Sequence, residues 1–115
     1  MLVKYLKSKI HRAVVTDANL DYEGSISVDE ALMEAAKLHV YEKVHVLDIT
    51  NGSRVETYII KASRGSGQIC INGAAAHLIK PQDQVIIISY CSLGEDDVLN
   101  YKPTVIKVNN HNQII

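Results

Sequence analysis

The sequence predicts a small, mainly β protein that closes into a barrel. Valine and isoleucine together make up 26 of the 115 residues, whereas only two residues are proline and none is phenylalanine or tryptophan. β-Branched side chains favour strands. Short apolar runs separated by turn residues recur along the chain. With many short strands and few helices, closure into a barrel buries the strand edges together with the core.

Six apolar runs are expected to form strands, and turn residues separate them. The runs cover residues 10–16, 44–49, 55–60, 68–71, 85–90 and 104–108. Asn51-Gly52 is the strongest hairpin signal, and residues 64–67 (Arg-Gly-Ser-Gly) are interpreted as a second hairpin turn. Turns are also expected at residues 72–73 and 81–83.

One helix is expected to begin after Ser27. Ser27 can cap it, Glu30 completes a capping box, and alanines and leucines between residues 31 and 38 follow with helical spacing. Shorter helical turns are expected at residues 74–78 and 95–99. The polar tail, residues 109–115, is expected to fray at its end.

Length and charge limit the function classes. A chain of 115 residues is one domain, residues 1–115, and its formal charge of −1 argues against nonspecific nucleic-acid binding. It has no run near the roughly 20 apolar residues of a membrane span, and no signal peptide. We therefore expect a cytoplasmic protein without nucleic-acid or membrane partners. Cys70 and Cys91 lack metal-ligand spacing and are interpreted as small core residues, so no metal site is expected.

Local sequence around Gly24 and Ser25 leaves the chemistry open. The segment does not fit the GxSxG nucleophile elbow, because Glu23 and Ser27 occupy the positions that need glycine. Taken alone, it is a turn before a helix.

Other candidate residues also have two interpretations. Alternation places Arg54 and Tyr58 on one face of a strand and Thr57 on the other. Arg54 and Tyr58 could bind an anion and present a phenolic proton, or could simply lie on a barrel exterior. His11 could be a base or a structural histidine. Residues 72–76 (Asn-Gly-Ala-Ala-Ala) offer unshielded backbone N–H groups for an oxyanion or carboxylate, or form a plain turn.

In combination, these motifs resemble the bacterial aspartate 1-decarboxylase family of pyruvoyl-dependent enzymes. The resemblance extends from Lys9 to about Tyr90 in the family's order and spacing. Ser8 stands where glycine is usual, Leu47 where some members have tryptophan, and Val55 where phenylalanine is common. The matching motifs are Lys9-Ile10-His11-Arg12, Tyr22-Glu23-Gly24-Ser25, Asn51-Gly52-Ser53-Arg54, Thr57-Tyr58 and Asn72-Gly73-Ala74-Ala75-Ala76-His77.

The resemblance implies a fold, an assembly and a reaction. The fold is a six-stranded double-psi β-barrel, and the assembly is a homotetramer with active sites between subunits. The reaction converts L-aspartate to β-alanine and CO₂, which feeds pantothenate and coenzyme A biosynthesis. The cofactor is a covalently bound pyruvoyl group, with no metal. The sequence leaves open whether a maturation factor is needed.

The resemblance also implies that the precursor cleaves itself between Gly24 and Ser25, giving residues 1–24 (β chain) and 25–115 (α chain). The Ser25 hydroxyl attacks the Gly24 carbonyl, the resulting ester is lost by β-elimination, and hydrolysis leaves the pyruvoyl group and ammonia. Glycine at position 24 is expected to admit a strained backbone and to leave its carbonyl carbon unshielded.

Roles for the remaining residues follow from the same resemblance. Thr57 polarises the Gly24 carbonyl and Asn72 stabilises the oxyanion, while His11 and Tyr22 line the cleavage site. The substrate forms a Schiff base with the group derived from Ser25, which acts as an electron sink. The remaining implied residues are the proton donor Tyr58 and the substrate-binding residues Arg54, Lys9, Gly73, Ala74 and Ala75.

One assignment within the substrate site rests on a physical argument. A cation on the departing carboxylate would stabilise the ground state and oppose formation of neutral CO₂. We therefore expect Arg54 to hold mainly the retained carboxylate.

Two alternatives stay open at this point. The chain could be a noncatalytic small β-barrel used as a binding module, because a fold does not decide function. It could also be a family member that folds but does not mature unaided.

Overall fold

The computed structural model describes all residues, 1–115, and contains eight strands and three short helical segments. Each of the six expected runs is confirmed as part of a strand. Strands β2 and β3 were not expected, and β1 begins at Leu2 rather than Ile10. The elements are β1 (Leu2–Val14), β2 (Asp17–Asn19), β3 (Ser25–Asp29), α1 (Glu30–Ala35), β4 (Lys43–Asp48), β5 (Arg54–Ala62), β6 (Ile69–Asn72), the 3-10 helix η1 (Gly73–His77), β7 (Gln84–Gly94), α2 (Glu95–Val98) and β8 (Thr104–Lys107).

The sheet closes on itself where β1 continues into β2. The strand order is β2-β6-β3-β5-β4-β7-β1-β8, so β1 and β2 lie near opposite ends although only two residues separate them. The Val15 N–H donates to the Asp83 carbonyl at 2.9 Å, and the Thr16 N–H donates to the Ile69 carbonyl at 2.8 Å. The Thr16 hydroxyl also accepts from the Ile69 N–H at 3.0 Å. These bonds join the two ends of the sheet into a barrel.

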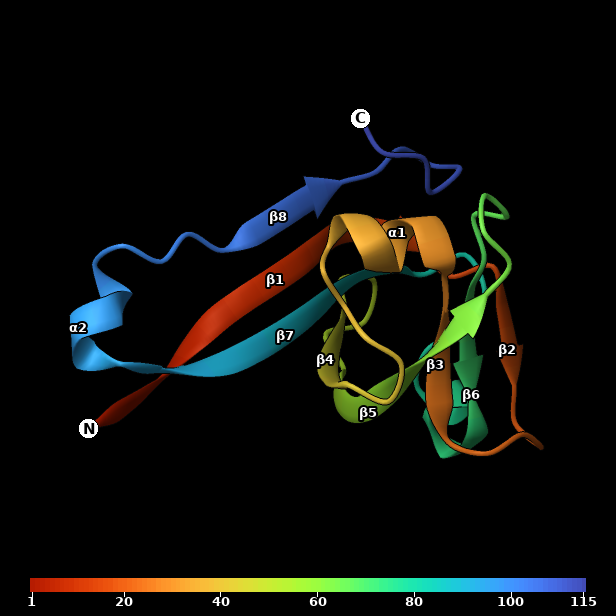
Figure 1. The fold of residues 1–115 in the computed structure, drawn as a ribbon. Helices are drawn as coiled ribbons and strands as arrows, with labels where there is room; N and C mark the ends of the chain where they lie inside the picture. The colour runs from red at the N-terminus through yellow and green to blue at the C-terminus, as the bar shows by residue number, and fades with distance from the viewer.

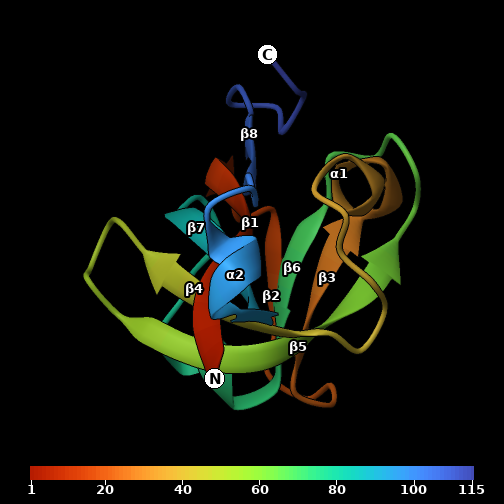
Figure 2. The same cartoon turned by 60° about the vertical axis from the view of Figure 1, so that its left-hand side comes forward.

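A long two-stranded ribbon of β1 and β7 extends away from the barrel, with α2 at its far end (Figures 1 and 2). The antiparallel pairing runs from Leu2 opposite Gly94 to Val14 opposite Gln84, and β8 pairs in parallel along β1. The register shifts between Ile10 and Ala13, which is a bulge that bends β1 where it enters the barrel. The ribbon makes the molecule elongated, 43 × 28 × 24 Å.

The core contains 19 buried apolar residues and lies inside the barrel. Alternation along each strand decides which side chains enter it. In β3, Ile26 and Val28 are fully buried in the core, so Ser25 and Ser27 point to the other face of the sheet. No helix has the length and apolar character needed to cross a membrane.

The prediction that Ser27 caps the helix is wrong. Ser27 lies inside β3, where it pairs with Ile60 of β5 and Cys70 of β6. The N-cap of α1 is Asp29, whose Oδ1 accepts the Ala31 N–H at 2.8 Å. Pairing on both sides keeps the segment before Asp29 extended, and this tertiary contact overrides the local capping motif.

The prediction that residues 64–67 form a hairpin turn is also wrong. Strand β3 lies between β5 and β6, so this loop must cross the end of β3 instead of joining neighbouring strands. The loop wraps around the Asp29 carboxylate, which accepts the Gly65 and Gly67 N–H groups at 2.9 Å each. Burial acts to raise the pKa of Asp29, but these N–H donors, that of Ala31 and the Arg64 charge bring it below its usual value.

The C-terminal tail is held in place at Asn112. Asn112 is buried, and its side chain accepts from the Val14 N–H at 2.7 Å. Its amide donates to the carbonyls of Val14 at 2.8 Å and Gly67 at 2.7 Å. The tail therefore ties the end of β1 to the loop that crosses β3.

Replacing Asp29 should destabilise the fold. Asp29→Ala removes the acceptor of three backbone N–H groups and should lower the free energy of unfolding by about 2–3 kcal/mol. Asp29→Asn keeps one acceptor oxygen and should lose less. Urea denaturation at fixed protein concentration measures both variants.

The same carboxylate predicts a pH dependence. Because the pKa of Asp29 is lower in the folded chain, its contribution is present above about pH 4 and is lost as the pH falls through the folded value. The difference in stability between wild type and Asp29→Asn should therefore shrink on acidification. A difference that is constant with pH would contradict this assignment.

Candidate active site at Ser25 and Asn72

The Ser25 hydroxyl is buried and held by Asn72. Ser25 begins β3, is 2% exposed, and lies opposite Asn72 at the end of β6. The Asn72 amide Nδ2 donates to the Oγ atoms of Ser25 and Ser27, at 3.0 Å each. The Ser25 hydroxyl in turn donates to the Glu23 carbonyl at 3.2 Å. The structure thus fixes the hydroxyl of Ser25, the residue that directly follows Gly24 in the chain.

Cys70 belongs to this cluster and is more than the small core residue that its sequence context predicts. Its thiol donates to Asn72 Oδ1 at 3.2 Å, which turns the Nδ2 of the amide toward the two serines. Burial, together with the nearby Asp17 charge, raises the pKa of Cys70, so the thiol stays protonated as a donor must. The sequence signal was the two-residue spacing of Cys70 and Asn72, which places both on one face of a strand.

Gly24 and Gly73 pack directly against each other. A Cβ built on Gly73 would lie 2.8 Å from the Gly24 Cα and 2.9 Å from the Gly24 nitrogen. Gly73 also has φ +78°, a left-handed value that favours glycine. Gly24 itself has no positive φ, and a Cβ there would meet no atom within 4 Å. The left-handed backbone therefore lies at Gly73, and Gly24, where the resemblance implies a strained backbone, has none.

On β5, the other neighbour of β3, Tyr58 is the predicted site residue nearest to Ser25. In the parallel pair of β3 and β5, Ile26 lies opposite Ile59. The residues that precede them, Ser25 and Tyr58, therefore lie side by side. Tyr58 lies on the face away from the core, and its ring contacts that of Tyr41, with centroids 6.1 Å apart. Thr57 has the opposite orientation, and no hydrogen bond links its hydroxyl to Gly24 or Ser25 in the uncleaved chain.

Arg54, Lys9 and His11 lie on the same outward face of the sheet, farther from Ser25. Arg54 begins β5, four residues before Tyr58, whereas Lys9 is on β1, three strands away from β5 in the sheet order. Partial burial, together with the charges of Arg12, Lys9 and Lys107, lowers the pKa of His11, so neutral imidazole is favoured.

The other predicted residues flank Ser25 or follow Asn72. Tyr22 is 53% exposed, three residues before Ser25. Gly73, Ala74 and Ala75 form the first turn of η1, directly after Asn72. In one chain, the predicted residues therefore form two groups: a cleavage cluster at β3, β6 and η1, and a cationic face on β5 and β1.

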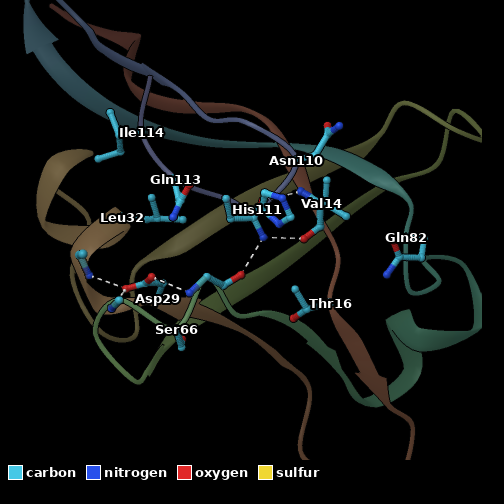
Figure 3. Close-up of a pocket in the computed structure, with 14 residues that line it drawn as sticks. Val14, Thr16, Asp29, Leu32, Ser66, Gln82, Asn110, His111, Gln113 and Ile114 are labelled. Carbon is cyan, nitrogen blue, oxygen red and sulfur yellow. Dashed lines mark hydrogen bonds between the residues drawn. The ribbon is translucent and has the colours of Figure 1, made fainter.

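The largest cavity in the chain lies elsewhere. It measures about 910 Å³ and lies between α1, the loop that crosses β3 and the C-terminal tail (Figure 3). Asp29, His111 and Gln113 line it, and none of the predicted site residues does. The chain also has no group of three His, Cys, Asp or Glu side chains arranged to hold a metal ion.

Comparison with known proteins assigns the family. The sequence model described as aspartate decarboxylase matches residues 1–115. This chain belongs to the aspartate decarboxylase family. It is 52% identical over 115 residues to the aspartate 1-decarboxylase of Caldicellulosiruptor bescii, covering 100% of this chain and 90% of the relative. Identity to the aspartate 1-decarboxylase of Acetivibrio thermocellus is 55%, covering 100% and 91%.

A solved structure supports the fold predicted for this aspartate decarboxylase family member. The computationally designed protein msDPBB_sym2 is 18% identical and superposes with a TM-score of 0.50, covering 76% of this chain and 99% of that chain. The fold is a double-psi β-barrel, as predicted.

Replacing Gly73 should cost more stability than replacing another glycine of similar φ. In Gly73→Ala, the methyl group meets the Gly24 backbone, so we expect a loss of about 2–4 kcal/mol in the free energy of unfolding. Gly52→Ala is the matched control, because Gly52 has φ +80° and no atom within 4 Å of its Cβ position. It should lose only about 1–2 kcal/mol. Equal losses in urea denaturation would show that the packing of Gly73 on Gly24 is unimportant.

The two cysteines should differ in reactivity. Cys70 is 6% exposed and its pKa is raised, whereas Cys91 is partly exposed. Iodoacetamide should therefore modify Cys91 first in the folded protein and both cysteines in urea. Peptide mass spectrometry measures the two sites separately. Equal rates in the folded state would mean that the contact between Cys70 and Asn72 opens readily.

Proposed function

We propose that the chain is a pyruvoyl-dependent decarboxylase that converts L-aspartate to β-alanine and CO₂, after cleaving itself between Gly24 and Ser25. The observation that carries this proposal is the buried hydroxyl of Ser25, which Asn72 holds in the residue that directly follows Gly24. Support comes from full-length relatives named aspartate 1-decarboxylase at 52–55% identity. We infer a cytoplasmic role in supplying β-alanine for pantothenate and coenzyme A.

The proposed cleavage step takes place between two residues that are neighbours in the chain. The Ser25 oxygen attacks the Gly24 carbonyl carbon, the Gly24–Ser25 amide breaks, and the serine nitrogen takes up a proton, which gives an ester. β-Elimination then releases the Gly24 carboxylate, and addition of one water with loss of ammonia completes the pyruvoyl group. The products are residues 1–24 and residues 25–115.

Asn72 acts before and during this cleavage. In the uncleaved chain, both of its N–H groups are donated to serine hydroxyls, so it positions the nucleophile. When the Gly24 oxygen becomes negative, an N–H of Asn72 that turns toward it would stabilise the charge, by roughly 3 kcal/mol for a well-placed donor. Thr57, His11 and Tyr22 are proposed to complete this environment, as the family resemblance implies.

The residues around Ser25 fit a pyruvoyl group. The buried amide of Asn72 can donate to its oxygens, and Gly73 leaves space that a side chain would fill. When formed, this group supplies the electron sink that loss of CO₂ from an amino acid requires. Tyr58, which the strand register puts beside Ser25, is the proposed donor of the proton that replaces the lost carboxylate at Cα.

Arg54 and Lys9 are proposed to bind the two carboxylates of the substrate, helped by the backbone N–H groups of Ala74 and Ala75. A guanidinium can grip one carboxylate with two parallel hydrogen bonds, while an ammonium adds a point charge. We assign the retained carboxylate mainly to Arg54, because a cation on the departing one would oppose release of neutral CO₂.

The two separate groups of residues favour a site shared between chains. Lys9 is three strands away from β5, and the cleavage cluster lies on the other side of β5 from β1. A second copy of the chain could bring its cationic face against Ser25. We therefore propose a homotetramer with active sites between neighbouring subunits.

Intact-mass measurement of the purified protein tests the self-cleavage. We expect two fragments, residues 1–24 and 25–115, with the larger fragment one ammonia lighter than simple hydrolysis would leave it. The cleaved protein should release β-alanine from L-aspartate. Ser25→Ala lacks the nucleophile, so it should stay intact and inactive while folding normally by circular dichroism.

Two other results would contradict the proposal. A wild-type chain that stays intact after prolonged warming would favour a noncatalytic barrel, or a family member that needs a maturation factor. A larger fragment that begins with an ordinary serine amine would mean that hydrolysis has occurred and that no pyruvoyl group forms.

A further inference from the structure

His45 contacts Arg54 and Glu56 at the same time, on the outward face of the sheet. The Arg54 Nη1 lies 3.2 Å from His45 Nδ1, and the Glu56 Oε1 lies 3.3 Å from His45 Nε2. The imidazole ring also packs edge-on against Tyr90, with centroids 5.1 Å apart. Contacts on three sides therefore fix the position of this ring.

The two polar partners define which nitrogen of the His45 ring carries the proton. A guanidinium only donates hydrogen bonds and a carboxylate only accepts them. His45 Nδ1 must therefore be the unprotonated acceptor for Arg54, and Nε2–H must be the donor to Glu56. Lys43 pairs with Glu56 at 3.2 Å, which keeps the carboxylate on the side of the sheet that faces His45.

This contact occupies only part of the guanidinium. Arg54 has five N–H donors, and a bond from Nη1 to His45 leaves enough of them to grip a carboxylate with two parallel bonds. Arg54 is otherwise exposed and has no ion pair in the structure. His45 is therefore the only side chain that orients it by a hydrogen bond.

We infer that His45 is a positioning residue for Arg54: by accepting from Nη1, it aims the guanidinium at the substrate carboxylate and so sets the strength of substrate binding. This inference rests on the proposed function. A long, exposed arginine loses side-chain entropy when it binds, and a contact that holds it beforehand reduces this cost.

Three substitutions test the inference. His45→Leu removes both polar contacts, whereas His45→Asn keeps an acceptor near the Nδ1 position. We expect His45→Leu to raise the KM for L-aspartate roughly three- to tenfold with little change in kcat, and His45→Asn to recover most of this loss. His111→Leu is the matched control, because His111 is exposed and lines the large cavity, which contains neither His45 nor Arg54.

The measurement uses fully cleaved protein, with the cleaved fraction checked by intact mass. An unchanged KM in His45→Leu, or a His45→Asn variant as impaired as His45→Leu, would overturn the inference while leaving the proposed function intact. A cleaved wild type that makes no β-alanine would overturn both.

A second readout does not need activity. Long-range ¹H–¹⁵N spectra of the imidazoles, assigned through the loss of signals in His45→Leu, report which ring nitrogen carries the proton. We expect neutral His45 to be protonated at Nε2. Protonation at Nδ1 would exclude acceptance from Arg54 and overturn the inference.

Discussion

The register between β3 and β6 is the constraint on which the candidate site depends. It sets Ser25 opposite Asn72 and Ser27 opposite Cys70, so four polar side chains meet on one face while isoleucines and valines fill the other. A slip of one residue would send the serines into the core and the isoleucines outward. The buried apolar face therefore fixes the position of Ser25, the proposed nucleophile.

Barrel closure maintains that register. β3 is held between β5 and β6, and its far end is tied by Asp29 to the loop that crosses it. Asn112 joins this loop to the end of β1, close to where the sheet closes. The proposed cleavage site lies in the short link before β3, where Gly73 approaches Gly24. The closed barrel thus surrounds the short segment for which we propose cleavage.

The outward face shows a second kind of organisation, based on charge. Polar contacts link four side chains of β4 and β5 in a row, in the order Arg54, His45, Glu56 and Lys43. Each contact is individually weak at an exposed position. Together they orient Arg54. Because these side chains stand on a rigid sheet, they hold Arg54 more precisely than a polar residue on a flexible loop would.

The sequence by itself determined the β class, six of the eight strands and the family, because β-branched runs, turn residues and ordered motifs are local signals. Only the tertiary structure decided that Ser27 belongs to a strand, that residues 64–67 cross over β3, and that Cys70 contacts Asn72 and His45 contacts Arg54. These features come from which strands become neighbours, and long-range pairing leaves no mark in a local pattern. The left-handed backbone likewise lies at Gly73 rather than Gly24, and the close approach of these two distant segments leaves no room for a side chain at position 73.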